Sequence, residues 1–320
     1  WGLERFGAKH DIMSADSHEG KLARLVVASW GKKEVWGRRQ DPDPPGIEVV
    51  FFLNMDARPD RRKALEEQFR QTNLQLERVS AFDAKADPAA TAACADLWKR
   101  RNETLLQHST CLGRIGCQRS HIRALREGVR RNLTAFAVIE DDFQVSPAAS
   151  HGSKLLEAVE AIQRNLPKWD AVLLSGMSIA GTPVLDGSQS AVPVNRIHAS
   201  WLNTGVVVRG SYAPTLIKAF EECDTLDAEH SIDYCWQEIQ ARDRWYIPVP
   251  ELGRQAPGMS DIDSYYKNWS QKGDGSQSDF QLYLRCLYRR MRQTLRGEER
   301  DQCRKQGSKK AAHAGSARKK

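Results

Sequence analysis

The sequence has 320 residues and a hydrophobic fraction of 40%, enough for one large α/β domain or two small ones. No apolar run approaches the ~18 residues needed to cross a bilayer, so we expect no transmembrane segment. The net charge of +7 comes from the end of the chain, where thirteen lysines and arginines against three acids follow Leu284. The rest of the chain is slightly acidic, so we expect no specific nucleic-acid partner.

Composition divides the chain into three parts. Residues 1–46 lack periodicity and end in a proline-rich stretch, which indicates an N-terminal extension or linker. Residues 47–270 carry the periodic segments and are the predicted domain. Residues 271–320 are a basic C-terminal extension whose last residues are rich in Gly, Ser, Ala and Lys, so we expect that end to be disordered.

Strands and helices alternate along the predicted domain. Apolar or strand-like runs predict strands at 47–53, 74–82, 135–139, 171–174, 206–208 and 245–249. Helical spacing predicts helices at 59–71, 115–131, 154–166, 213–223 and 232–242. The alternation predicts an α/β fold with a mostly parallel central sheet and helices on both faces. Ligands of such sheets bind beyond the carboxyl ends of the strands.

Three adjacent acids, Glu140, Asp141 and Asp142, follow the predicted strand 135–139 directly. Their repulsion is tolerable if a cation lies among them, and oxygen ligands suit Mg²⁺ and Mn²⁺. Side chains alternate along an extended segment, so Glu140 and Asp142 are expected to face one metal while Asp141 faces elsewhere. The alternative interpretation is a solvated acidic strand end.

A charged segment follows the first predicted strand and opens a helix. It contains Asn54, Asp56, Arg58, Arg61 and Arg62. A helix N-terminus favours anions, and arginines there suit a diphosphate. The alternative interpretation is an ordinary charged first turn of a helix.

A third segment, residues 112–121, places Gly113 and Gly116 around the start of the predicted helix and ends in His121. The glycines permit close approach of the backbone to a ligand or to another element. The pattern is neither a dinucleotide fingerprint nor a phosphate-binding P-loop. A single histidine on a helix is more often structural than catalytic.

The seven cysteines predict mostly buried thiols. Cys111, Cys117 and His121 lie close together, but their spacing is not a usual zinc pattern. Glycosylation sequons beginning at Asn102, Asn132 and Asn268 permit a secretory location without demonstrating one.

Taken in order, these segments resemble glycosyltransferase family 25, which includes bacterial lipooligosaccharide galactosyltransferases and animal procollagen galactosyltransferases. The motifs that carry the resemblance are Asn54–Arg61, Arg78–Asp83, Leu112–His121 and Glu140–Asp142. Weaker matches follow at Leu174–Gly176, Thr204–Gly205, Asp233 and Ser260–Ile262. The resemblance covers about residues 47–265 and departs from the family pattern at Ala57, where an arginine is common.

The resemblance implies a GT-A-type nucleotide-sugar-binding fold and an inverting transfer. It implies a UDP-sugar donor, usually UDP-galactose, Mn²⁺ (or Mg²⁺), and a glycan or protein hydroxyl as acceptor. Glu140 and Asp142 would then hold the metal, and Asp233, with Asp261 in reserve, would be the base that takes the acceptor proton. The donor side would be lined by Asn54, Asp56, Arg58, Arg61, Arg62, Gly113, Gly116 and His121.

Two other functions stay open at this point. One is a non-catalytic relative that binds a glycan or a nucleotide, and the other is a metal-dependent phosphohydrolase. The compartment also stays open: the secretory lumen for a eukaryotic protein, the cytoplasm or the membrane periphery for a bacterial one.

Overall fold

A computed structural model describes residues 46–256, with gaps at 71, 73, 102–104, 147–152, 167, 187–191 and 224–231. The basic extension 271–320, all but the last residue of the extension 1–46, and Asp261 lie outside the described residues. The described residues all fall within one compact unit of the chain.

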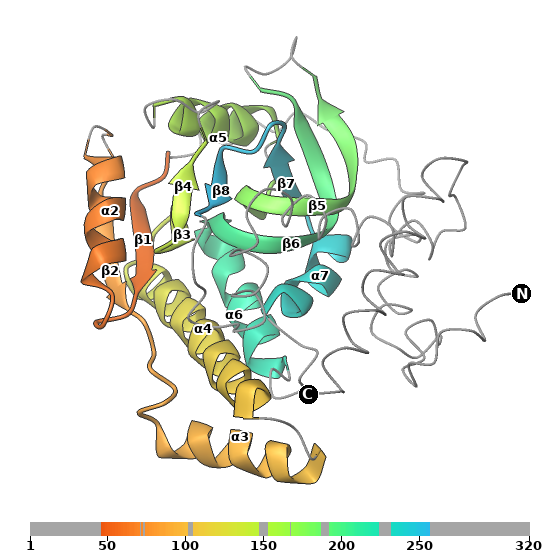
Figure 1. Cartoon of the computed structure of the whole chain (residues 1–320). Coiled ribbons are helices and arrows are strands. Elements are labelled where there is room, and N and C mark those ends of the chain that lie inside the picture. Colours follow the sequence, from red (N-terminus) through yellow and green to blue (C-terminus); the bar gives the residue numbers. More distant parts are fainter. Residues whose placement is uncertain are drawn as a thin grey trace, which may run out of the picture. The chain divides into compact units, whose positions relative to one another are not determined.

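A six-stranded sheet forms the centre of the described fold, in the order β2-β1-β3-β6-β5-β7 (Figure 1). Its strands are β1 (Val49–Asn54), β2 (Leu76–Ser80), β3 (Ala135–Glu140), β5 (Ala171–Leu185), β6 (Val194–Arg209) and β7 (Trp245–Pro248). β1 runs parallel to β2 and β3, and β5 runs parallel to β7, whereas β6 is antiparallel to β3, β5 and β7. The α/β prediction is confirmed, and the architecture is consistent with a GT-A-like fold.

Helices cover both faces of this sheet (Figure 1). They are α2 (Pro59–Phe69), α4 (Leu105–Arg130), α5 (Ser153–Asn165), α6 (Ala213–Glu222) and α7 (Ile232–Arg242), with a 3₁₀ turn η2 (Gly210–Tyr212) before α6. Helix α3 (Pro88–Arg101) packs against α4 instead of the sheet (Figure 1). Apolar side chains of α2 and α5 share one core with the sheet, and those of α4, α6 and α7 share a second core on the other face. None of the described helices is both long and apolar enough to cross a membrane.

Helix α4 begins at Leu105, well before its predicted start at residue 115. Gly113 and Gly116 therefore lie within the helix and not around its start. A side chain at position 116 would meet the backbone oxygen of Phe82 at 2.9 Å. The glycine thus allows α4 to approach the segment after β2, so at this position the close approach is to another element rather than to a ligand.

The described residues contain two disulfides, Cys94–Cys111 between α3 and α4 and Cys223–Cys235 between α6 and α7. The prediction of mostly buried thiols is wrong for these four cysteines, because pairing depends on distances in the fold that sequence spacing does not show. Cys117 is the free cysteine of the described part of the chain.

The carboxyl ends of β1, β2 and β3 meet at one edge of the sheet. In the register of these parallel strands, Asn54 is the partner of Ser80, and Leu53 is the partner of Glu140. A second, two-stranded sheet borders this edge, formed by β4 (Phe143–Val145) and β8 (Gly253–Gln255). The charged segments found in the sequence are therefore brought together at the edge where α/β sheets bind ligands.

Candidate active site

The three acids stand at the junction of the two sheets. Glu140 is the last residue of β3, and Asp141 and Asp142 form the turn that leads into β4. Their side chains are 19%, 11% and 13% exposed, respectively, so this is not a solvated strand end. Because residues 141 and 142 lie in a turn, the strand alternation expected for them does not decide where each side chain points.

Asp141 is held by paired groups on the β1–α2 side. One carboxylate oxygen accepts a hydrogen bond from Asn54 Nδ2 at 2.8 Å, and the other accepts one from Arg61 Nη1 at 2.8 Å. Asn54 is itself buried, and its amide also bonds Arg58 and Arg78. Both polar groups of the Asn54 amide and the guanidinium of Arg61 are thus committed to protein partners.

Asp142 has a different environment. Its Oδ2 accepts a hydrogen bond from Gln255 Nε2 at 3.1 Å and lies 3.7 Å from Arg61 Nη1, whereas its Oδ1 is buried without a hydrogen-bond partner. Burial, together with the charge of Glu140, raises the pKa of Asp142 to about 7. A buried carboxylate oxygen without a donor is costly, and a divalent cation would satisfy it.

Glu140 turns toward helix α4. Its Oε1 lies 3.2 Å from His121 Nε2 and 3.7 Å from Cys117 Sγ. Cys117 and His121 stand four residues apart on α4 and therefore project from one side of the helix. Burial, followed by the charge of Glu140, raises the pKa of the Cys117 thiol.

His121 was expected to line the donor side, but the structure places it in an apolar setting. Its side chain is 3% exposed and contacts the rings of Phe220 and Trp236 edge to face. These rings fix the orientation of the imidazole against Glu140.

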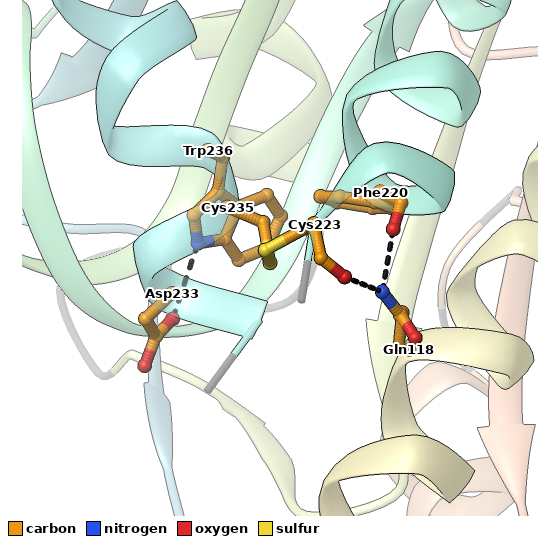
Figure 2. Close-up of a disulfide and its surroundings, with 6 residues drawn as sticks. All are labelled: Gln118, Phe220, Cys223, Asp233, Cys235 and Trp236. Carbon is orange, nitrogen blue, oxygen red and sulfur yellow. Dashed lines mark hydrogen bonds between the residues drawn. A yellow bond between two sulfur atoms is a disulfide. The ribbon is translucent and has the colours of Figure 1, made fainter. Parts of the chain in front are cut away.

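Asp233, the candidate base, lies in the first turn of α7. Figure 2 shows it beside the Cys223–Cys235 disulfide, with Trp236 Nε1 donating to its Oδ1 at 3.2 Å. On the facing helix, Gln118 donates to the backbone oxygens of Phe220 and Cys223 and so holds the end of α6 (Figure 2). The charge of Asp233 also contributes to raising the pKa of the Cys117 thiol, which places it in the electrostatic neighbourhood of the acids.

The end of β2 contributes a residue that was not among the predicted site residues, although it begins one of the motifs that carry the resemblance. Arg78, on β2, pairs with the exposed Asp56 and also donates to the backbone oxygen of Asn54 at 3.0 Å. Ser80 donates to the same carboxylate of Asp56 at 3.1 Å. The signal in the sequence is a charged residue in the middle of a predicted strand.

The other arginines predicted for the donor side are engaged locally. Arg58 pairs with Asp60 and Arg62 pairs with Glu66, both as exposed contacts of helix α2. Gly113 lies half-buried inside α4. The structure therefore brings Asn54, Asp56 and Arg61 to the acidic turn and its edge, and it does not gather the arginines into one anion site.

Comparison with known proteins matches residues 47–171 to the model of glycosyltransferase family 25 (LPS biosynthesis protein). A mouse protein named procollagen galactosyltransferase 2 is 25% identical over 135 residues, which are 42% of this chain and 21% of that protein. The resemblance inferred from the motifs is confirmed.

Two further relatives bear on activity. A Drosophila pseudoobscura pseudoobscura protein named glycosyltransferase 25 family member is 29% identical over 104 residues, 32% of this chain and 16% of that protein. A bovine protein named probable inactive glycosyltransferase 25 family member 3 is 27% identical over 148 residues, 45% of this chain and 24% of that protein. The chain thus matches about a quarter or less of the length of each of these relatives.

Proposed function

We propose that this chain, whose residues 47–171 match glycosyltransferase family 25, is a metal-dependent inverting glycosyltransferase that uses a UDP-sugar, most simply UDP-galactose. The observation that supports it best is the buried Oδ1 of Asp142, which has no partner and stands next to Glu140 at the carboxyl edge of the sheet. Glu140 and Asp142 would hold Mn²⁺ or Mg²⁺, which when bound neutralises the charge that develops on the leaving nucleoside diphosphate.

The remaining residues bind and orient the donor. Asp141 fixes Arg61 beside the acidic turn, so a positive charge remains close to the place where a diphosphate would lie. Asp56 is exposed and is held by Arg78 and Ser80 at the end of β2, where its carboxylate can accept bonds from a ribose or a base. We propose this edge as the nucleoside side of the site.

Asp233 is the proposed base for the acceptor hydroxyl. Inversion in a single displacement requires a group that takes the hydroxyl proton, and Trp236 orients the Asp233 carboxylate at the start of α7 for this role. We keep Asp261, which lies outside the described residues, as the reserve candidate.

Relatives from mouse and human are named procollagen galactosyltransferase 2, so we propose a protein or glycan hydroxyl as the acceptor. The two disulfides further support maturation in an oxidising compartment such as the secretory lumen, because disulfides are rare in reducing compartments.

A binding and turnover experiment tests the proposal. The wild type is incubated with UDP-galactose, UDP-glucose or GDP-mannose, with Mn²⁺ or with EDTA, and with a procollagen chain as acceptor; released nucleoside diphosphate and labelled product are measured. We expect Mn²⁺-dependent transfer from a UDP-sugar. Transfer in excess EDTA would contradict the proposal. So would a melting temperature, measured with Mn²⁺ and each nucleotide sugar, that rises with GDP-mannose but not with UDP-sugars.

The same experiment separates the two alternatives. Tight Mn²⁺-dependent UDP binding without transfer or donor hydrolysis would identify a non-catalytic relative. The bovine relative named as probably inactive is the reason to test for this outcome. Acceptor-independent cleavage of the donor into nucleoside monophosphate and sugar 1-phosphate would identify a phosphohydrolase.

The Asp233→Asn variant tests the base. A general base contributes about 10²–10⁴-fold, so transfer should fall by that factor while Mn²⁺-dependent UDP binding stays within a few-fold. Normal transfer by this variant would remove Asp233 from the mechanism and direct attention to Asp261.

A further inference from the structure

We propose that Cys117, His121 and Glu140 form a Zn²⁺ site, separate from the cation that the donor requires. Each residue offers one ligand atom, and the three atoms lie within 4.8 Å of one another. The proposal goes beyond donor chemistry and does not depend on it.

Two of the three separations between the ligand atoms are close to those around a tetrahedral zinc ion, and the third is at most 4.8 Å. With bonds of about 2.0–2.3 Å to N, O and S, tetrahedral angles place neighbouring ligand atoms about 3.3–3.6 Å apart. The observed separations are 3.2 Å between His121 Nε2 and Glu140 Oε1 and 3.7 Å between Cys117 Sγ and the same oxygen. Small side-chain movements would therefore suffice to bind an ion.

The ligand chemistry selects the metal. Thiolate and imidazole ligands favour Zn²⁺ over Mn²⁺ or Mg²⁺, which prefer oxygen. Three protein ligands leave a fourth position for water, as is typical of open zinc sites. Binding displaces the proton of the Cys117 thiol to solvent, because the thiolate is the ligand.

The fold holds two of the ligands before any ion arrives. Cys117 and His121 are one turn apart on the 26-residue helix α4. The rings of Phe220 and Trp236 restrict the imidazole of His121, and Glu140 is fixed as the last residue of β3. Preorganised ligands lower the entropic cost of binding.

Glu140 is a proposed ligand of both the zinc ion and the cation that binds the donor. The oxygen that faces Cys117 and His121 is Oε1, and a carboxylate can bind one ion through each of its two oxygens. Zinc at Oε1 therefore does not by itself remove Glu140 from the donor site.

Cobalt substitution tests the site. Co²⁺ is titrated into the full, disulfide-intact chain carrying Cys286→Ser and Cys303→Ser, so that Cys117 is the remaining thiol. We expect a sulfur-to-cobalt charge-transfer band with a stoichiometry of one, together with the strong visible bands of tetrahedral Co²⁺, all reversed by Zn²⁺. A folded protein without a charge-transfer band would overturn the proposal.

Matched variants identify the ligands. Cys117→Ser should abolish the band, and its persistence would place the metal elsewhere. His121→Gln should weaken Co²⁺ binding by at least about 100-fold, since even groups behind a metal ligand are worth 10–100-fold. His198→Gln, which changes a buried histidine bonded to Thr182, should leave the band and the affinity unchanged.

A second readout keeps this site distinct from the proposed function. Asp142→Asn should lose Mn²⁺-dependent UDP binding and keep the cobalt–thiolate band. Cys117→Ser should lose the band and keep Mn²⁺-dependent UDP binding within a few-fold. Loss of the band in Asp142→Asn would show that there is one shared metal site, and would overturn the separate zinc site without touching the transferase proposal.

Discussion

Asp141 and Asp142 are consecutive residues of one turn with nearly equal exposure, yet they stand in opposite environments. Asp141 belongs to a paired group with Asn54 and Arg61, in which both of its carboxylate oxygens have donors. Asp142 belongs to an open group with Glu140, in which one oxygen is buried without a donor and burial raises the pKa of Asp142 to about 7. The contrast is the reason to propose Asp142, whose Oδ1 lacks a donor, as a metal ligand in place of the slightly more buried Asp141.

The Asp142→Asn substitution tests the open group and carries the largest expected effect. Removing this charge should lower transfer by at least about 100-fold, the scale of losing one transition-state charge contact, and should weaken Mn²⁺-dependent UDP binding. The variant should remain folded with an unchanged or higher apo melting temperature, because a buried, unsatisfied carboxylate is removed. Calorimetry and nucleotide release measure the two effects, and full transfer by the variant would contradict the comparison.

The Asp141→Asn substitution, the matched control, should show the opposite profile. Weakening the partly buried pair with Arg61 should reduce the free energy of unfolding by about 2–3 kcal/mol, since a charge loses its partner. Transfer by the fraction that remains folded should fall less than in Asp142→Asn. Urea denaturation measures the loss of stability, and specific activity measures the loss of transfer. Equal losses of activity in Asp141→Asn and Asp142→Asn would contradict the distinction between the paired and the open group.

The pH dependence of apo stability sharpens the comparison. The pKa of Asp142 is raised from 3.8 to about 7 on folding, so between these values the folded state binds the extra proton. The stability that this proton contributes is present at low pH and is lost as the pH rises toward 7. The wild type should therefore lose stability relative to Asp142→Asn between pH 4.5 and 7.5, and Mn²⁺ at pH 7.5 should reverse the loss. A difference in the free energy of unfolding between the wild type and Asp142→Asn that stays constant from pH 4.5 to 7.5 would show that Asp142 is ionised in the folded protein throughout this range.

The Gln255→Ala substitution gives the smallest expected effect. Gln255 donates to Asp142, and this hydrogen bond lowers the pKa of Asp142, so its loss should raise that pKa further. The midpoint of the pH profile for Mn²⁺-dependent UDP binding should shift upward accordingly. Arg254→Ala, which changes an exposed neighbour on β8, is the control that should leave the midpoint in place.

The sequence predicted the larger elements well where apolar periodicity was strong. The buried strand that ends at Glu140 and the two helices of the C-terminal half lie close to their predicted bounds. Helix α3 was missed because it is alanine-rich, with high helix propensity but little apolar pattern. The antiparallel course of β6 was also missed, because periodicity does not reveal strand direction.

The position of the acidic turn was predicted correctly, because it follows a buried strand. The separate environments of Asp141 and Asp142 were not predicted. The alternation argument assumed an extended backbone, whereas Asp141 and Asp142 lie in a turn. The zinc pattern was sought among Cys111, Cys117 and His121, although Cys111 is in a disulfide and the third ligand comes from β3. Distances between residues far apart in the chain decide such sites, and a single sequence does not contain them.

Residues 116–121 of α4 carry a consequence for how this protein can change over evolution. Position 116 is pressed against the carbonyl of Phe82, Gln118 holds the end of α6, and Cys117 and His121 meet Glu140. Substitutions in this hexapeptide are expected on its exposed side, at Arg119, because a tilt of the helix would displace the segment after β2, the acidic turn and the α6 terminus together. A library of variants should therefore leave Gly116, Cys117, Gln118 and His121 fixed.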